Sequence, residues 1–186
     1  MDENKRDEVI DDLVKFALIA LIVVLPIRLF VAQPFVVRGA SMEPTFHNKE
    51  YLIVDQLSYR FEDPERGDVV ILRYPKDPSV FFIKRVIGLP GETVELIGST
   101  IAITREGQPT FTLDETYLAP DRLQNEYGVY TLNDNEYFVL GDNRHESSDS
   151  RSWGVLVRDK VVGRAMLRLL PLNRIDVLPG DESYAQ

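Results

Sequence analysis

The chain has 186 residues, of which 44% are hydrophobic and 27% are charged, a balance typical of one folded domain with its own core. Its formal net charge of −9 at pH 7 argues against a nucleic-acid binder, which would carry a basic face. The chain has no cysteine and two histidines, which excludes thiol catalysis and cysteine-based metal sites and disfavours a multi-histidine site. We therefore expect no metal ion and no other cofactor.

The N-terminal part joins a short acidic tail, residues 1–12, to the most apolar stretch of the chain, residues 13–32. As a helix, this stretch would cover about 30 Å at about 1.5 Å per residue, and Arg28 near its end could reach lipid headgroups. The pattern predicts one transmembrane anchor. A cleaved signal peptide and a buried core helix remain alternatives, although a signal peptide would begin with a cationic segment. The flanking charges do not determine an orientation.

From residue 33 to residue 186 the pattern changes to short apolar or alternating segments bounded by turn residues, which indicates a β-rich domain. Within it, the polar and turn-rich region at about 95–135 is expected to be a small irregular excursion that starts with one hairpin. The predicted fold class is mainly β with antiparallel sheets. Strands are expected at 35–37, 50–55, 68–73, 80–87, 93–97, 100–104, 136–140, 155–157 and 161–170.

The segment 39–45 presents one hydroxyl in a defined place. Ser41 follows the small pair Gly39-Ala40 and precedes Pro44, which fixes the local backbone. Turn chemistry alone favours a plain turn capped by a side-chain hydroxyl. The alternative is that Ser41 is a nucleophile.

Lys84 interrupts the apolar run Val80–Ile87, where an ammonium group is costly if the strand is buried. One explanation is an edge strand on which Lys84 and Arg85 face water. The other is that Lys84 points inward. Burial would then lower its pKa from about 10.4 to about 8, so that the amine could accept a proton from a serine hydroxyl.

The dense polar loop 141–151 contains Asp142, Asn143 and Asp149, whose spacing does not follow the calcium-loop pattern. A triad of Ser41, His145 and an acid can also be written, but no spacing favours it. A supporting role is the third hypothesis. In that role Ser147 would hold an amine by its hydroxyl, and Asp149 would pair with Arg144 or Arg151.

Four motifs occur in order: SMEPT at 41–45, RGDVV at 66–70, KRVIGLPGE at 84–92, and GDNR at 141–144 followed by Ser147, Asp149, Ser150 and Arg151. Together, over about residues 34–170, they resemble the type I signal peptidases, membrane-anchored Ser–Lys proteases that remove signal peptides from exported proteins. The resemblance implies a mainly antiparallel β fold with an apolar surface on the bilayer.

The resemblance also implies roles for individual residues. Ser41 would be the acyl nucleophile and Lys84 the general base. Ser147 would hold the Lys84 amine, and Asp149 with Arg151 would brace the loop. The Ser41 N–H would bind the oxyanion, and the serine that some members place two residues before the nucleophile is Gly39 in this chain.

The family cleaves after a small residue that follows another small residue two positions earlier, an Ala-x-Ala-like pattern. Shallow apolar pockets would explain this preference, because they exclude bulk more readily than they select it. A substrate strand is expected beside residues 81–84. The residues at matching positions are Phe35, Val37, Met42, Phe82 and Ile83, and plain core packing is the alternative for each.

By resemblance, the partners would be signal-peptide-bearing pre-proteins and the lipid bilayer of a bacterial-type inner membrane. The N-terminus would be cytoplasmic, the catalytic domain would lie on the far side, and the protein would be a monomer. Two other hypotheses stay open: a Ser–Lys maturation peptidase with a dedicated substrate, and a membrane-tethered β-rich assembly factor that has lost activity.

Overall fold

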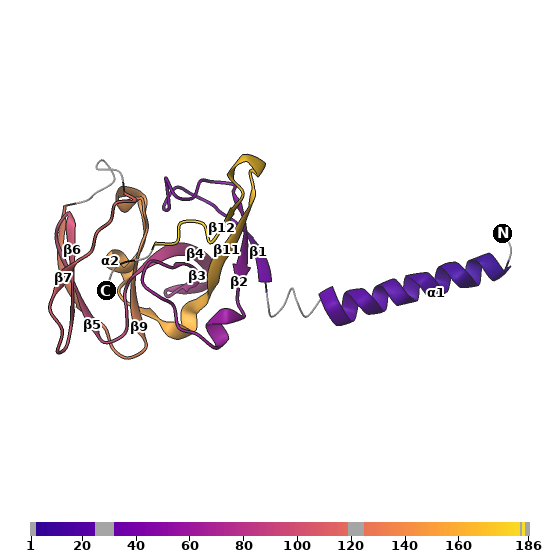
Figure 1. The fold of residues 1–186 in the computed structure, drawn as a ribbon, viewed down its shortest axis with the longest axis horizontal. Coiled ribbons are helices and arrows are strands. Elements are labelled where there is room, and N and C mark those ends of the chain that lie inside the picture. Colours follow the sequence, from indigo (N-terminus) through magenta and orange to yellow (C-terminus); the bar gives the residue numbers. More distant parts are fainter. Residues whose placement is uncertain (1–2, 25–31, 119–124, 183, 185–186) are drawn as a thin grey trace.

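The computed structural model describes residues 3–24, 32–118, 125–182 and 184. Its N-terminal part is helical: α1 (Glu3–Ile19) continues into one π-helical turn (Ala20–Val24), and both extend away from a β-rich body (Figure 1). The helix therefore starts within the tail expected at 1–12. None of the helices in the described ranges is both long enough and apolar enough to cross a membrane. Residues 25–31, within the predicted anchor, lie outside the described ranges.

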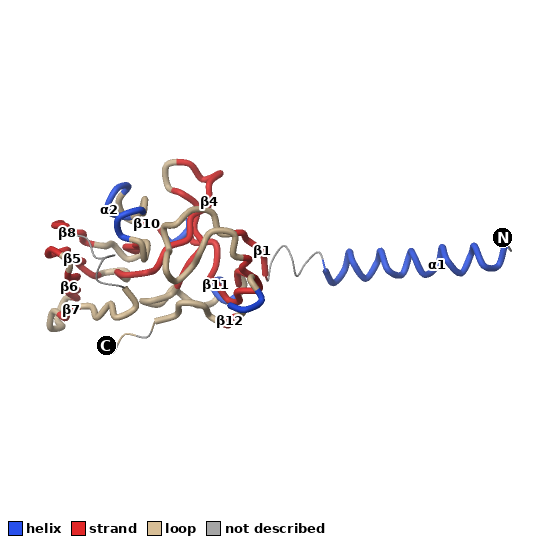
Figure 2. The backbone as a smooth tube through the Cα atoms, turned by 90° about the horizontal axis from the view of Figure 1, so that it is seen from above, coloured by secondary structure: helices blue, strands red, loops and turns tan. Residues whose placement is uncertain are grey.

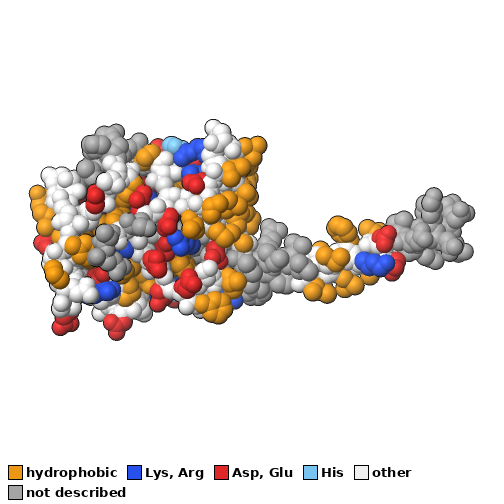
Figure 3. Space-filling model, in the orientation of Figure 1, with side chains coloured by type: hydrophobic (Ala, Val, Ile, Leu, Met, Phe, Trp, Pro, Cys, Tyr) orange, Lys and Arg blue, Asp and Glu red, His pale blue; other side chains and the backbone are white. Residues whose placement is uncertain are grey.

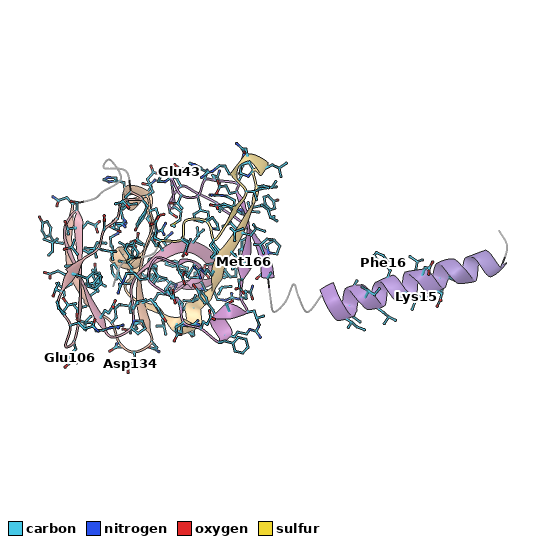
Figure 4. All side chains as sticks on the ribbon, viewed as in Figure 1. Lys15, Phe16, Glu43, Glu106, Asp134 and Met166 are labelled. Atoms are coloured by element: carbon cyan, nitrogen blue, oxygen red, sulfur yellow. The ribbon has the colours of Figure 1, made fainter. Side chains whose placement is uncertain are left out.

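The apolar side chains of α1 are not covered by the body. Lys15 and Phe16 project from α1 into the open in Figure 4, and Phe16 is 78% exposed. Lys15 pairs with Asp11 one turn earlier, at 2.8 Å between Nζ and a carboxylate oxygen. Such exposed i,i+4 pairs stabilise a helix by only about 0.3–0.5 kcal/mol. Because the described side chains of α1 are exposed, packing against the body does not stabilise this helix either.

The larger antiparallel sheet of the described chain has the order β1-β2-β11-β3-β4-β9-β10, with β12 beside β11. Sequence analysis predicted most of these strands, and the mainly β fold class is confirmed. The short strand β10 ends this path, and the short strand β12 lies off it. The bounds are β1 (Ala32–Val36), β2 (Tyr51–Asp55), β3 (Val69–Tyr74), β4 (Asp77–Gly88), β9 (Glu136–Leu140), β10 (Leu156–Val157), β11 (Val161–Leu170) and β12 (Asp176–Val177).

The smaller sheet, with the order β7-β6-β5-β8, lies at the end of the body opposite α1 (Figures 1 and 2). The predicted hairpin forms between β5 (Glu92–Gly98) and β6 (Thr100–Arg105). The region expected to be irregular is more ordered than predicted. Its later part supplies β7 (Phe111–Thr112) and β8 (Glu126–Thr131), and β8 pairs with β5 from Thr93 to Gly98.

Short helices complete the body. A four-residue helix, α2 (Ser150–Trp153), begins at the end of the polar loop 141–151, and Asp149 caps its N-terminus. The 3-10 helices are Ser58–Arg60, Arg144–Glu146, Arg158–Lys160 and Leu172–Arg174.

Both faces of the larger sheet are buried at β3, which matters for the charges on the neighbouring strand β4. Along β3, Val69 and Ile71 belong to one hydrophobic cluster, while Val70 and Leu72 belong to another on the opposite face. Since successive side chains of a strand point to opposite faces, neither face at this point contacts water. Adjacent residues of the paired strand β4 are therefore buried on opposite sides.

The pairing of β4 changes along its length. Residues Phe81–Arg85 pair with β3 on one edge, whereas β9 takes the other edge from Arg85 to Gly88. Between Phe81 and Lys84 the edge of β4 away from β3 is thus not covered by β9. This uncovered edge borders the candidate site.

Candidate active site

The structure brings Ser41 and Lys84 together, although 43 residues separate them in sequence. Ser41 lies in the loop after β1, and Lys84 lies on the interior strand β4. The Lys84 Nζ donates to the Ser41 Oγ at 2.9 Å. This distance suits proton transfer, and the direction of the bond reverses when the amine is neutral.

Lys84 is 2% exposed, and no carboxylate of the described residues lies at salt-bridge distance from its amine. Its second hydrogen bond goes to the main-chain carbonyl of Ile83 at 2.7 Å. Burial lowers the pKa of Lys84 to about 8, against the opposing charges of Asp149 and Asp142. A substantial fraction of this amine is therefore neutral near pH 8.

Arg85, the next residue, is 0% exposed on the other face of β4. Its guanidinium donates to both oxygens of Asp142, at 2.9 and 2.7 Å, and to the carbonyl of Gly67 at 2.9 Å. Burial alone would lower the pKa of Arg85, but the Asp142 carboxylate outweighs it and raises the pKa. The edge-strand explanation for Lys84 and Arg85 is therefore wrong, because β4 lies inside the sheet and both cations are buried.

Asp149 and Arg151 form a two-bonded ion pair in the polar loop. Arg151 donates to the two oxygens of Asp149 at 2.8 Å each, and the N–H of Gly141 donates to Asp149 at 3.0 Å. Burial raises the pKa of Asp149, but the Arg151 hydrogen bonds and charge outweigh it and lower the pKa. Asp149 is therefore a carboxylate at neutral pH, and it joins the end of β9 to α2.

Ser147 lies close to the dyad without a hydrogen bond of its own. Its hydroxyl is buried and contributes to the low pKa of Asp149, but it meets hydrogen-bond geometry with no described residue. No bond from Ser147 to the Lys84 amine is formed, since that amine contacts Ser41 and the Ile83 carbonyl. The role of Ser147 in holding the amine stays a prediction.

Gly141 is the point where the loop meets the nucleophile. A Cβ at Gly141 would lie 2.2 Å from the Ser147 Oγ and 2.4 Å from the Ser41 carbonyl oxygen. Real Cβ atoms essentially never approach so closely. Glycine is thus needed here for close approach of two backbones.

Sequence reasoning did not assign Asn143 and Glu115 to the site. Asn143 donates from its side chain to the Ala40 carbonyl at 3.1 Å and from its main chain to the Ser41 carbonyl at 3.0 Å. Glu115 pairs with Arg144, whose Nε also donates to the Gly141 carbonyl at 3.1 Å. The GDNR motif contained a signal for Asn143 and Arg144. Glu115 lies in the region predicted to be irregular and had none.

A groove of about 470 Å³ leads to Ser41 and Lys84. Its walls come from β1 with the following residues, and from β4. The rings of Phe35 and Phe81 meet edge to face across it, with centroids 5.4 Å apart. Of the predicted pocket residues, four line the groove, namely Phe35, Val37, Phe82 and Ile83.

Met42 is the predicted pocket residue that lies elsewhere. It is almost wholly buried, in the hydrophobic cluster that includes Phe46, and does not line the groove. Core packing, the alternative for each pocket position, is what the structure has at Met42. His145 is exposed, and no hydrogen bond within the described ranges joins it to Ser41. The geometry therefore offers Lys84, and not His145, as the partner of the hydroxyl.

Gly39 has a φ of +92°, in the left-handed region that favours glycine, and a Cβ there would meet open space. Its N–H donates to the Asn48 side chain at 3.3 Å. No side-chain donor for an oxyanion is present at this position.

Comparison with known proteins places this geometry in a family. The model of the family described as signal peptidase, peptidase S26, matches residues 10–170. The chain therefore belongs to this family of peptidases.

Among curated relatives, a probable signal peptidase I-2 of Synechocystis sp. is 38% identical over 175 residues, covering 91% of this chain and 78% of the relative. Signal peptidase I of Leptolyngbya laminosa is 38% identical over 191 residues (98% and 90%), and signal peptidase I S of Bacillus subtilis is 36% identical over 172 residues (87% and 89%). A crystal structure of a signal peptidase I from Enterococcus faecalis V583 matches with a TM-score of 0.47 and 30% identity, over 55% of this chain and 97% of that one. The resemblance to type I signal peptidases is thus confirmed.

Proposed function

We propose that the protein is a membrane-anchored serine endopeptidase that removes N-terminal signal peptides from exported pre-proteins. The observation that carries the proposal is the buried Lys84 amine, 2.9 Å from the Ser41 hydroxyl at the end of an apolar groove. A serine hydroxyl is a weak nucleophile until an adjacent base accepts its proton. An amine with a pKa of about 8 serves as that base near neutral pH.

The proposed reaction has two steps. In acylation, neutral Lys84 takes the Ser41 proton, the Oγ bonds to the scissile carbonyl carbon, and the carbon–nitrogen bond breaks as Lys84 returns the proton to the leaving amine. In deacylation, Lys84 takes a proton from water, whose oxygen attacks the ester carbon. The released Ser41 oxygen then recovers the proton. The N–H of Ser41 is the proposed oxyanion donor.

The groove supports cleavage after small residues. Aromatic and branched side chains narrow it, with Phe35 and Val37 on one wall and Phe82 and Ile83 on the other. Apolar walls this close leave little depth for a substrate side chain, so bulky residues would be excluded by contact. The Ala-x-Ala-like preference is part of the proposal, and a general or a dedicated set of pre-proteins fits it equally.

Membrane association is proposed on two grounds. Residues 13–32 are the most apolar stretch of the chain, and we propose them as the single anchor, with the N-terminus cytoplasmic. The body also shows an apolar edge on the side facing α1 (Figure 3). We define this apolar edge by exposed side chains of β1, β2, the end of β11, β12 and the 3-10 turn between β11 and β12, namely Val36, Tyr51, Leu170, Leu172, Ile175 and Val177. Large exposed apolar patches mark interaction surfaces, and a bilayer is the one proposed.

The test is cleavage of a pre-protein by the full chain in detergent. Ser41→Ala and Lys84→Ala should each abolish processing, while Ser99→Ala and Lys76→Ala, on exposed turn residues, should process at the wild-type rate. Wild-type activity in either of the first two variants would refute the proposal. Cleavage of one specialised pre-protein alone would indicate a dedicated maturation peptidase. Failure of the wild type to form an acyl-enzyme with any substrate would indicate an inactive assembly factor.

A further inference from the structure

Asn143 holds the two peptide units that flank the nucleophile. Its side-chain Nδ2 donates to the carbonyl of Ala40 at 3.1 Å, and its main-chain N–H donates to the carbonyl of Ser41 at 3.0 Å. Asn143 is 2% exposed, so water does not compete for these bonds. One residue of the polar loop thus fixes the backbone before and after Ser41.

The Ala40 carbonyl and the Ser41 N–H belong to the same peptide unit. Such a unit is planar, and in the trans form its C=O and N–H point in opposite directions. The Ala40 oxygen accepts a second bond, from the Glu43 N–H at 3.1 Å, so both of its lone pairs are engaged. Fixing this oxygen therefore fixes the direction in which the Ser41 N–H points.

The Ser41 N–H itself donates to no residue of the described chain. It is thus available for an oxygen atom of a ligand. Hydrogen bonds in series polarise one another, by perhaps 10–30% per bond, so two donors on the carbonyl make the N–H on the same unit a stronger donor. The arrangement prepares one main-chain donor beside the nucleophile.

We propose that Asn143 is a positioning residue for the oxyanion: it holds the Ala40–Ser41 peptide unit so that the Ser41 N–H donates to the negative oxygen of the tetrahedral intermediate. This inference rests on the proposed function. Gly39 offers no side-chain donor, so the site depends more heavily on this one N–H. Asn143 does not touch the substrate and acts through Ser41.

The neighbours of Asn143 in the loop serve a different purpose. Asp142 binds Arg85 inside the sheet, and Arg144 binds Glu115. Both of these side chains connect parts of the scaffold. Asp142 also accepts from the hydroxyl of Thr45, four residues after Ser41, at 2.5 Å. Of the three side chains, the one with a bond to the peptide unit of Ser41 itself is Asn143, which separates its role from general support of the fold.

The experiment compares Asn143→Ala with Asn133→Ala in the full chain, assayed on a signal-peptide substrate. The alanine at 143 keeps the main-chain bond to Ser41 and removes only the amide donor. Asn133 is the matched control, because its exposed side chain donates to Glu136 in a distant turn. For Asn143→Ala we expect kcat to fall by about 10–100-fold, since small misplacements of catalytic groups cost up to about 100-fold.

Three further readouts separate positioning from structure. KM should stay within about twofold, because the oxyanion forms only in the transition state. The ascending limb of the pH–rate profile should not move, because Lys84 is unchanged. Affinity for a peptide aldehyde, whose hemiacetal oxygen occupies the oxyanion position, should fall in parallel with kcat/KM.

Wild-type kcat in Asn143→Ala, a rise in KM alone, or a shifted ascending limb would each overturn the inference. If Asn143→Ala unfolds at the assay temperature, Asn143→Asp keeps the size of the side chain and replaces the donor with an oxygen. The same loss of kcat is then expected, and wild-type kcat would overturn the inference. Activity of Ser41→Ala in the same assay would instead refute the proposed function, so the two failures are distinguishable.

Discussion

On one face of β4 the Lys84 amine lies buried against a hydroxyl and a main-chain carbonyl, with no carboxylate at salt-bridge distance. On the other face the Arg85 guanidinium is buried against both oxygens of Asp142. The two cations are adjacent in sequence and equally removed from water, yet their pKa values move in opposite directions. The two pKa values diverge because the two cations have different partners, and not because one cation is more deeply buried than the other.

The contrast between these partners indicates a different role for each face of β4. A buried charge with a well-placed counter-charge is locked in its ionised form and ties elements together. A buried charge without one is costly, and it lowers that cost by losing its proton. For Lys84, a depression from 10.5 to about 8 corresponds to about 3 kcal/mol. Under the proposed function, the Lys84 face of β4 thus provides reactivity and the Arg85 face provides stability.

Replacing Lys84 with methionine should break the reactive face and spare the stable one. We expect kcat/KM to fall by about 10⁴-fold or more, as for loss of the base in other serine proteases. The free energy of unfolding at pH 7 should stay level or rise by up to about 3 kcal/mol, because the cost of the buried amine disappears. Denaturant unfolding beside the activity assay checks both, and a large loss of stability would contradict the contrast.

Replacing Arg85 with methionine should do the reverse. The change leaves the Asp142 carboxylate buried without its partner, which costs about 3–5 kcal/mol of unfolding free energy. Arg105→Met is the control, because the Arg105 side chain is 44% exposed and lies 3.6 Å from Glu92, which keeps its closer partner Arg66 at 2.7 Å when Arg105 is lost. We expect this change to cost less than about 1 kcal/mol. The measurement is denaturant unfolding of both variants. Equal stabilities of the two would show that the buried pair does not hold the sheet.

The pH dependence tests the same contrast within one residue. Below a pH of about 8 the buried amine is charged and its full cost is present; the cost is relieved as pH rises toward 10.5, where the unfolded chain also loses the proton. The stability advantage of Lys84→Met should therefore shrink between these two values.

The rate on a signal-peptide substrate should rise with an apparent pKa of about 8 in wild type and in His145→Ala alike. Loss of the limb in His145→Ala would favour the triad with His145.

The smallest expected effect is that of the Asp149 carboxylate, whose negative charge acts on Lys84 from beyond salt-bridge distance. Asp149 raises the pKa of Lys84, so Asp149→Asn should move the ascending limb to lower pH. The plateau rate should fall as well, because Arg151 and Gly141 lose their shared carboxylate. Asp134→Asn, at the outer tip of the turn between β8 and β9 (Figure 4), should move neither. A limb shifted to higher pH in Asp149→Asn would contradict the assignment of charges around Lys84.

Much of the larger sheet could be predicted from sequence, because its strands carry strong apolar runs between turn residues. The pairing of β8 with β5 could not be predicted from sequence. All positions of Glu126–Thr131 are exposed or half-buried, so the apolar signal of this strand is weak. The burial of both Lys84 and Arg85 was also beyond local pattern. It depends on β9 and β3 lying on either side of β4, which are contacts between distant segments.

For the site, motif and residue type predicted that Lys84 would lie beside Ser41 and that Asp149 would pair with Arg151, and both contacts are present. The catalytic roles stay predictions. The Met42 position was misjudged because a residue next to a nucleophile can point into the core as easily as into the groove. Asn143 was missed as a contributor because its bonds are to main-chain carbonyls, which no sequence pattern displays. These bonds can be recognised only from a structure, which gives the distance between the loop of Asn143 and the segment of Ser41.

The uncovered edge of β4 also sets a measure for the substrate. The edge away from β3 is uncovered from Phe81 to Lys84 and reaches a stop where β9 begins to pair at Arg85. Within this stretch the Ile83 carbonyl already accepts from the Lys84 amine. Under the proposed function, an extended peptide that pairs along this edge cannot slide past that stop. A slip of one residue would also turn every side chain of the peptide to the opposite face. Under the proposed function, we therefore expect the pairing register along β4 to determine which peptide bond is cut.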